Sequence, residues 1–166
     1  METLTPPLIK WPETNMPIRF SDCDLYGHLS NIWYLKYFLD AREDHLANSY
    51  GLSLGAFAKQ GIGWVVSTNQ ISYFRPAKVN EQVVIRSAVV DFSPTHVLVE
   101  IQMLDEKRTH IKSALWSKFV HVNLKDGRKT EHGRNMMELF EKIKLEDITT
   151  DYNTRMQELK VSNLIS

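Results

Sequence analysis

Residues 19 to 46 read RFSDCDLYGHLSNIWYLKYFLDAREDHL, and this stretch decides the fold. The pattern predicts a short strand over residues 18–20, a polar turn, and then a long helix that begins at Ser30 or Asn31 and ends near Tyr50. Either Ser30 or Asn31 can cap this helix, because a short side-chain oxygen accepts hydrogen bonds from the free N–H groups of the first turn.

The first half of this helix is apolar or aromatic on nearly every side, and the pattern turns polar from Asp40 onward. A helix resting on a surface has one apolar stripe, whereas a helix that is apolar all round is enclosed. We therefore expect the helix to begin deep in the protein and to end in water. The residues that carry this pattern are Ile32, Trp33, Tyr34, Leu35, Tyr37, Phe38 and Leu39.

The polar turn before the helix contains Asp22, Asp24, Gly27 and His28. The start of a buried helix presents unpaired N–H groups and a partial positive charge, which can polarise a carbonyl oxygen. Such a group beside a potential base or nucleophile is the minimum equipment for acyl transfer. The simpler interpretation is that Asp24 only caps a turn, that Asp22 is structural and that His28 is packed or solvated.

Beyond the helix, the hydrophobic period changes to that of strands joined by short turns. Consecutive strands with short connections are antiparallel, because a parallel crossover needs many more residues. The chain therefore predicts an α+β fold, a five-stranded antiparallel sheet wrapped around a long central helix, with an extra C-terminal helix. The expected later elements are strands over 62–74, 81–92, 96–104 and 111–123, a helix over 135–146, and a further helix or a draped segment from 147 onward.

Size and charge exclude several classes of protein. With 166 residues, the chain predicts one domain over 1–166. The 20 Lys and Arg balance the 20 Asp and Glu, so no basic excess indicates nucleic acid or an anionic membrane as a partner.

Cellular location and metal content are also predicted from the residues. Cys23 is the single cysteine, so no intrachain disulfide can form, and two acidic neighbours disfavour its thiolate. Met1–Pro7 has neither the basic lead nor the apolar core of a signal peptide, and no apolar run is long enough to cross a membrane. A cytoplasmic location is expected. No two histidines have metal-ligand spacing, so we predict no metal.

The polar turn and its helix resemble the 4-hydroxybenzoyl-CoA thioesterase-like hotdog family. The similarity spans roughly residues 16–125, which leaves 126–166 as a C-terminal helical extension. Many relatives have two asparagines where this chain has Ser30 and Asn31. The residues that carry the resemblance are Asp22-Cys23-Asp24, Tyr26-Gly27-His28-Leu29-Ser30-Asn31, Tyr34-Leu35, Tyr37-Phe38, Ala41-Arg42 and Ile71-Ser72-Tyr73-Phe74-Arg75-Pro76-Ala77.

The resemblance implies a hotdog fold, assembled as a homodimer whose sheets join edge to edge, with a homotetramer in many members. It implies hydrolysis of an acyl-CoA or acyl-carrier-protein thioester, with no cofactor beyond the coenzyme A of the substrate. Asp24 would act as nucleophile or as general base. The backbone amide at about Asn31 would hold the thioester carbonyl, and His28 would lie beside the site.

Further residues are candidates for substrate binding. Gly27 supplies a backbone angle that other residues avoid. Tyr34 and Phe38 either line an acyl pocket, which is typically apolar, or simply fill the core. Coenzyme A carries phosphates, so a basic rim is expected. The candidates for that rim are Arg75 and Lys78, followed by Lys112, Lys118 and Arg128.

Two other functions remain open at this point. A hotdog protein can bind acyl-CoA or an acyl carrier without hydrolysing it, because a fold does not fix a function. A hydratase is a weaker alternative, because the chain lacks the histidine-bearing signature of that class.

Overall fold

The computed structural model describes residues 8–165, so the expectation for Met1–Pro7 lies outside it. In the described chain, five strands form one sheet in the order β1-β3-β4-β5-β2, and every neighbouring pair is antiparallel. This confirms the predicted sheet. The strands are β1 Glu13–Pro17, β2 Ile62–Tyr73, β3 Gln82–Phe92, β4 His96–Asp105 and β5 Ile111–Asn123.

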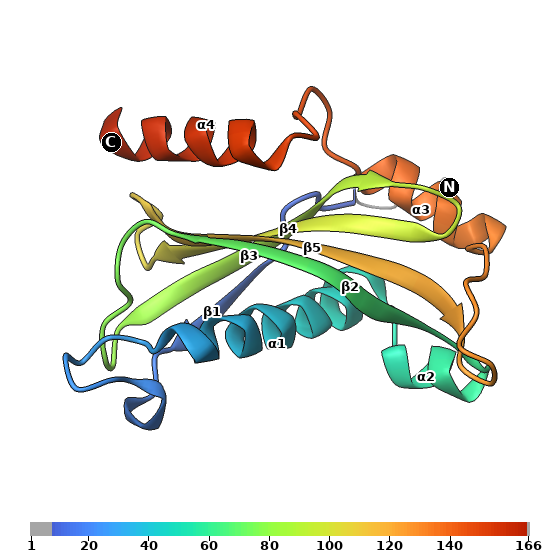
Figure 1. The fold of residues 1–166 in the computed structure, drawn as a ribbon, viewed down its shortest axis with the longest axis horizontal. Helices are drawn as coiled ribbons and strands as arrows, with labels where there is room; N and C mark the ends of the chain where they lie inside the picture. Colours follow the sequence, from blue (N-terminus) through green and yellow to red (C-terminus); the bar gives the residue numbers. More distant parts are fainter. Residues whose placement is uncertain (1–7, 166) are drawn as a thin grey trace, which may run out of the picture.

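The long helix α1, Asn31–Tyr50, lies across one face of the sheet (Figure 1). Tyr34, Phe38 and Ala41 are buried, and they form one core with inward-facing side chains of β3, β4 and β5. The helix ends at Gly51, which has a φ of 64° and donates its N–H to the carbonyl of Leu46. A left-handed glycine is a common way to end a helix.

The expectation that the first half of α1 is enclosed on all sides is wrong for the single chain. Ile32 is 77% exposed. The sheet covers only one side of the helix, so the apolar residues on its other side remain open to solvent. The second half also differs from the expectation, because Arg42 and His45 lie in the interior rather than in water.

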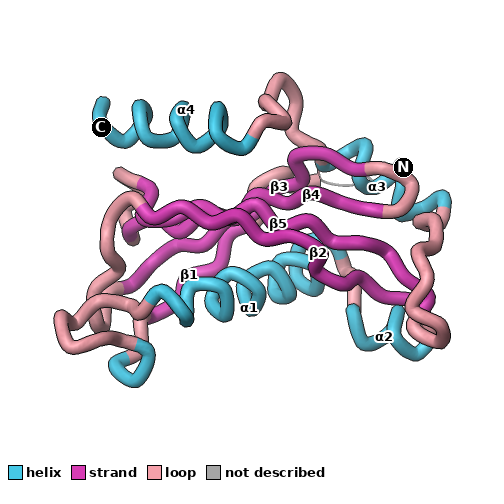
Figure 2. The backbone as a smooth tube through the Cα atoms, viewed as in Figure 1, coloured by secondary structure: helices cyan, strands magenta, loops and turns pink. Residues whose placement is uncertain are grey.

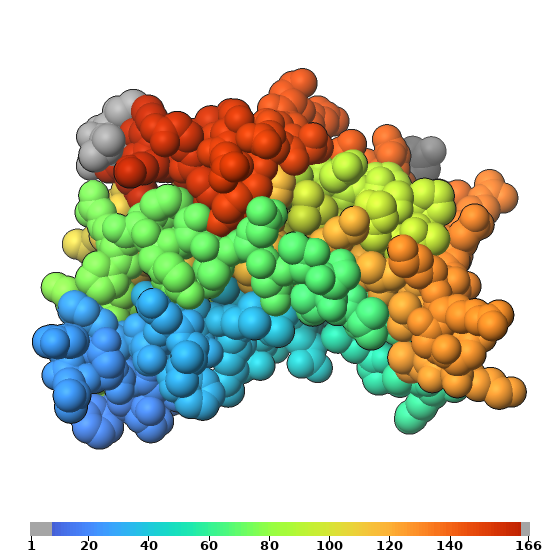
Figure 3. Space-filling model, in the orientation of Figure 1, coloured from blue at the N-terminus to red at the C-terminus, as the bar shows by residue number. Residues whose placement is uncertain are grey.

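The opposite face of the sheet is covered by α4, Tyr152–Ile165 (Figures 1 and 2). Met156 and Leu159 of this helix form a second buried cluster with Trp116 and other outward-facing strand residues. In the space-filling view, the red atoms of α4 pack directly along one side of the molecule (Figure 3). The predicted C-terminal helical extension is therefore present. It also includes α3, Arg134–Ile143.

The first strand differs from the prediction of residues 18–20. The strand is β1, Glu13–Pro17, which pairs with β3 at the edge of the sheet. Ile18 is fully buried and its backbone bonds with Glu81 and Asn80, whereas Phe20 is 81% exposed in a short 3-10 turn. The sequence signal failed because an edge strand needs little apolar character.

The other edge of the sheet is β2, which bonds only with β5. A register shift between Val66 and Thr68 bends this strand. The short helix α2, Leu54–Lys59, precedes β2 and lies beside it (Figure 1). The outer edge of β2 therefore has no partner strand within residues 8–165.

Candidate active site

The carboxylate of Asp24 shapes its own turn. Its Oδ1 accepts hydrogen bonds from the N–H groups of Tyr26 at 2.9 Å and His28 at 3.2 Å. The Asp24 N–H donates to the carbonyl of His28, and the Gly27 N–H donates to the carbonyl of Asp24. No group in residues 8–165 pairs with Oδ2, and the side chain is exposed. Asp24 therefore caps the turn with one oxygen and leaves the other free for chemistry.

Gly27 makes this turn possible. Its φ is 73°, a conformation that residues with a Cβ adopt at a cost. The predicted need for a special backbone angle at this position is confirmed.

The turn is bonded to the loop between β2 and β3. The Leu29 N–H donates to the carbonyl of Ala77 at 2.8 Å, and the Val79 N–H donates to the carbonyl of Gly27 at 2.8 Å. This pairing puts His28 opposite Lys78. Two segments about fifty residues apart in sequence thus form one rigid unit around Asp24.

The start of α1 follows this unit directly. Ser30 is the N-cap residue, but its side chain makes no capping bond, so the expected side-chain cap is absent. The Ser30 N–H donates to the carbonyl of Asp22, and the Trp33 N–H donates to the carbonyl of Ser30. Within residues 8–165, the N–H of Asn31 has no protein acceptor. This amide is therefore available to a ligand.

Asp22 has a structural role, as the simpler interpretation predicted. Its Oδ2 accepts the hydroxyl hydrogen of Tyr37 at 2.7 Å, and that hydroxyl accepts the N–H of Arg19 at 3.0 Å. Burial, together with the Asp22 carboxylate, raises the pKa of Tyr37 to about 12, so the phenol stays protonated and donates. Burial and both acidic neighbours also raise the pKa of the Cys23 thiol, as expected.

Tyr34 and Phe38 lie in the interior beneath the turn. The Tyr34 hydroxyl accepts the N–H of Ala77 at 3.3 Å, and its ring meets that of Tyr73 edge to face at 5.0 Å. Phe38 is fully buried in the core. Their role in substrate binding stays a prediction.

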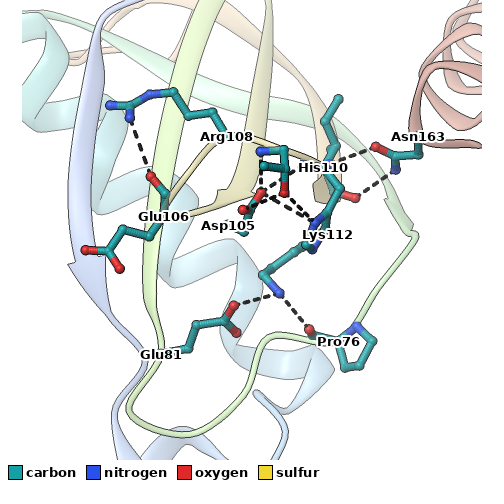
Figure 4. Close-up of polar contacts among 10 residues, drawn as sticks. Pro76, Glu81, Asp105, Glu106, Arg108, His110, Lys112 and Asn163 are labelled. Carbon is teal, nitrogen blue, oxygen red and sulfur yellow. Dashed lines mark hydrogen bonds and ion pairs between the residues drawn. The ribbon is translucent and has the colours of Figure 1, made fainter. Parts of the chain in front are cut away.

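The basic residues near the turn separate into two groups. Arg75 and Lys78 are exposed, and neither has an ion-pair partner among the described residues. The expectation that Lys112 is a rim residue is wrong. Its side chain is buried, and its Nζ lies 2.9 Å from Oε1 of Glu81 and 3.1 Å from the Pro76 carbonyl oxygen (Figure 4).

Glu81 is a residue near the site that the sequence reasoning did not name as a site residue, and that reasoning did not foresee that Lys112 pairs with it. Oε2 of Glu81 accepts the N–H of Lys78 at 2.8 Å, so the carboxylate holds the loop that in turn holds the Asp24 turn. The one available signal was a lysine inside a strand that is otherwise buried. Nothing in the sequence indicates that its partners lie some thirty residues upstream.

A cavity of about 280 Å³ lies at the other end of α1. It lies between the second half of α1, α2, the sheet and α3, and most of its lining is aliphatic or aromatic. The sequence reasoning did not predict this cavity. Representative lining residues are Leu39, Arg42, Leu46, Phe57, Trp64 and Phe140.

Two other properties bear on the site. Across residues 8–165, no group of three or more His, Cys, Asp or Glu side chains lies close enough to hold a metal ion. The helices of that same range include none with the length and hydropathy needed to span a bilayer.

Comparisons with known proteins agree with this architecture. The family model described as the thioesterase-like superfamily matches residues 18–140. The long-chain acyl-CoA thioesterase FadM of Escherichia coli (strain K12) is 29% identical over 114 residues, which are 68% of this chain and 84% of that protein.

Solved structures share the fold. The DHNA-CoA thioesterase from Staphylococcus aureus superposes with a TM-score of 0.71 at 18% identity, covering 91% of this chain and 93% of that one. The probable thioesterase YbaW from Escherichia coli gives a TM-score of 0.69 at 25% identity, covering 80% and 98%.

Proposed function

The chain belongs to the thioesterase-like superfamily and is a thioester hydrolase, and from this we propose that it hydrolyses acyl-CoA esters to a free acid and a thiol. One observation carries the proposal. The Asp24 carboxylate has one oxygen fixed by its turn and the other free, and the turn is followed by a helix whose first amide is unpaired. The FadM relative, whose name specifies long-chain acyl-CoA, supports this class of substrate.

The proposed mechanism uses the free Oδ2 of Asp24. This oxygen either attacks the thioester carbon or removes a proton from the water that attacks it. The carbonyl oxygen accepts the N–H of Asn31, so the negative charge that develops on it meets the positive end of α1. Collapse of the tetrahedral intermediate breaks the C–S bond and releases the thiolate. In the base route, the thiolate takes the proton that Asp24 removed from the water, and the acyl group leaves as the free acid. In the nucleophile route, the acyl group stays on Asp24 as an anhydride, the thiolate takes a proton from solvent, and a water molecule then hydrolyses the anhydride to the free acid and the Asp24 carboxylate. No cofactor takes part, because coenzyme A arrives and leaves with the substrate.

The residues around Asp24 complete the proposed site. Gly27 fixes the turn, and His28 lies beside the carboxylate at its rim. Arg75 and Lys78 are exposed cations without a partner in the described chain, and they are suited to the phosphates of coenzyme A or of a carrier protein. Tyr34 and Phe38 support the site from the interior.

We propose that the protein acts in the cytoplasm as a homodimer joined through β2. The outer edge of β2 has no partner strand in the part of the chain that the structure describes, and Val65 and Val66 are 47% and 42% exposed. An unpaired edge of this length is a template for a second strand. Light scattering at micromolar concentration should give twice the mass of the chain, or four times if dimers pair further. A monomeric mass would contradict this assembly.

The test of the function compares Asp24→Asn with Asp126→Asn. Asp126 caps a distant exposed turn in the same way, through a 3.0 Å bond to the Arg128 N–H. Asparagine keeps the accepting oxygen in both turns, so both variants should fold. Thiol release from a panel of acyl-CoA esters should fall about 10²–10⁴-fold in Asp24→Asn and stay unchanged in Asp126→Asn.

Two outcomes would count against the proposal. Wild-type turnover in Asp24→Asn would show that Asp24 is not the catalytic group. Tight binding of acyl-CoA by the wild-type protein without thiol release would instead identify a non-catalytic acyl-CoA-binding protein.

A further inference from the structure

The guanidinium of Arg42 is buried in the middle of α1 with little to balance its charge. The residue is 6% exposed. Its Nη1 donates to Oγ of Ser87 at 2.9 Å, which is its one hydrogen bond within residues 8–165. No Asp or Glu in this range forms an ion pair with it. Burial lowers the pKa of Arg42 to about 10, so the side chain still carries its charge at neutral pH.

The neighbouring polar groups do not neutralise this charge. Nδ1 of His45 lies 2.7 Å from Oγ of Ser87. Either atom of this pair can donate, because a serine oxygen that accepts from Arg42 can still accept a second hydrogen bond. Burial, followed by the charge of Arg42, lowers the pKa of His45 to about 4. The imidazole is therefore neutral, and one net positive charge remains in the interior.

A buried charge without a counter-charge is strongly unfavourable, and proteins normally pair such groups. The unpaired side-chain atoms that are sealed from solvent in the described chain are Nε2 of His45 and Oγ of Ser117. The remaining nitrogens of Arg42 are not among them, so solvent still reaches them. Arg42 is also one of the residues that line the 280 Å³ cavity.

The cavity otherwise suits an aliphatic chain. Its volume of about 280 Å³ is that of about nine groups the size of a water molecule, at about 30 Å³ each. The two acidic residues that line it, Asp40 and Glu43, are exposed, and Asp40 pairs with Lys36 at 3.1 Å. These carboxylates are in water, whereas the positive charge is inside. An anion with an apolar chain therefore gains most by placing its charge at Arg42.

We propose that this cavity binds an aliphatic carboxylate of about eight carbons, with the chain against the apolar lining and the carboxylate at the free N–H groups of Arg42. The binding requires no hydrolysis, and in that respect it goes beyond the proposed function. Two kinds of ligand carry both an aliphatic chain and a carboxylate. One is a free fatty acid, the product class of a thioesterase, and the other is an acyl group that carries a second carboxylate at its far end.

The test compares octanoate with octanol, which have the same carbon chain but differ in charge. Calorimetric titration of the wild-type protein should give about ten- to a hundredfold tighter binding of octanoate, the range expected for hydrogen bonds to a charged group. Arg42→Met should remove this preference, whereas Arg134→Met, whose side chain is 91% exposed in the native protein, should keep it.

Several results would overturn the proposal. They are equal or tighter binding of octanol, binding of neither ligand, and a preference for octanoate that persists in Arg42→Met. The wild-type comparison decides the matter even if Arg42→Met does not fold. The same titration in Asp24→Asn separates this site from catalysis, because octanoate should bind there with unchanged affinity.

The two kinds of ligand are separated with substrates. If the carboxylate belongs to the acyl group, the CoA ester of the eight-carbon dicarboxylic acid should have a kcat/KM about tenfold or more above that of octanoyl-CoA. If it belongs to a free acid, octanoate should instead inhibit hydrolysis at concentrations near its Kd. If the enzyme releases thiol but shows neither of these two effects, the proposal that a carboxylate binds in this cavity is contradicted.

Discussion

Arg155 joins the C-terminal helix to the sheet through an ion pair, and its substitution should lower the free energy of unfolding. Its Nε and Nη2 lie 2.8 Å and 2.9 Å from the two carboxylate oxygens of Glu100, in a bidentate pair. Glu100 is fully buried on β4. The carboxylate also accepts Nε1–H of Trp116 at 2.8 Å and Nε2–H of Gln102 at 2.5 Å. The pair thus joins α4 to the outer face of the sheet.

The expected loss follows from what remains after Arg155→Met. Removing one partner of a buried ion pair costs about 3–5 kcal/mol, because the other charge stays buried without compensation. Trp116 and Gln102 still donate to Glu100, so we expect the lower end of this range, about 3 kcal/mol. The methionine preserves much of the apolar stem, so the loss reports mainly on the charge.

The assay is urea denaturation, with Glu158→Gln as the matched control. Arg155 also contacts Glu158, but at 3.5 Å and with the glutamate side chain 52% exposed. Exposed pairs contribute at most about 1 kcal/mol, so the control should change the free energy of unfolding by less than that. Adding Glu100→Gln to Arg155→Met should recover part of the loss, because no buried charge is then left. Equal effects of Arg155→Met and Glu158→Gln would refute the reasoning.

Three further outcomes are expected. Gly27→Ala should cost about 1–2 kcal/mol, because its φ is 73°. Gly55→Ala, inside α2, should stabilise by about 0.5–1 kcal/mol in the same urea titration, because a Cβ there would lie 3.8 Å from Oγ of Ser53, an ordinary contact. Burial lowers the pKa of His45 and His132 to about 4, whereas a histidine of the unfolded chain has a pKa of roughly 6.5. The contribution of these neutral, buried imidazoles to the free energy of unfolding is therefore complete above pH 6.5 and is lost as the pH falls toward 4. Unfolding at pH 7 and pH 4.5 should differ by on the order of 2 kcal/mol for each histidine, and a flat profile would contradict these assignments. Lys112→Met should lower kcat more than it raises KM, with recovery in Lys112→Arg, and unchanged kinetics would exclude a positioning role.

The sequence predicted most of the sheet because burial there follows a simple period. Val97, Val99, Ile101 and Met103 alternate with more polar residues, and the observed β4 differs from the predicted span by one residue at its end. The edge strand β1 escaped prediction for the opposite reason. Thr14 and Asn15 belong to a strand that has one neighbour and little apolar surface to bury.

The turn around Asp24 was predictable because its chemistry is local. Gly27, His28 and the start of α1 all lie within a few residues of it. Lys112 and Arg42 were misjudged because both are charged, and the general expectation for charged residues is solvent. Their burial depends on contacts with Glu81 and Ser87, which are distant in sequence and leave no periodic signal.

The helix laid over the outside of the sheet also limits how copies of the chain can assemble. A broad sheet surface would otherwise be free to stack against another molecule. Here Met156 and Leu159 already occupy that surface, and the pairing of Arg155 with Glu100 opposes its release. Association between copies is therefore directed to the side of the molecule where α1 is open, or to the outer edge of β2, which has no partner strand within residues 8–165. The C-terminal helix therefore prevents two sheets from stacking face to face through this surface.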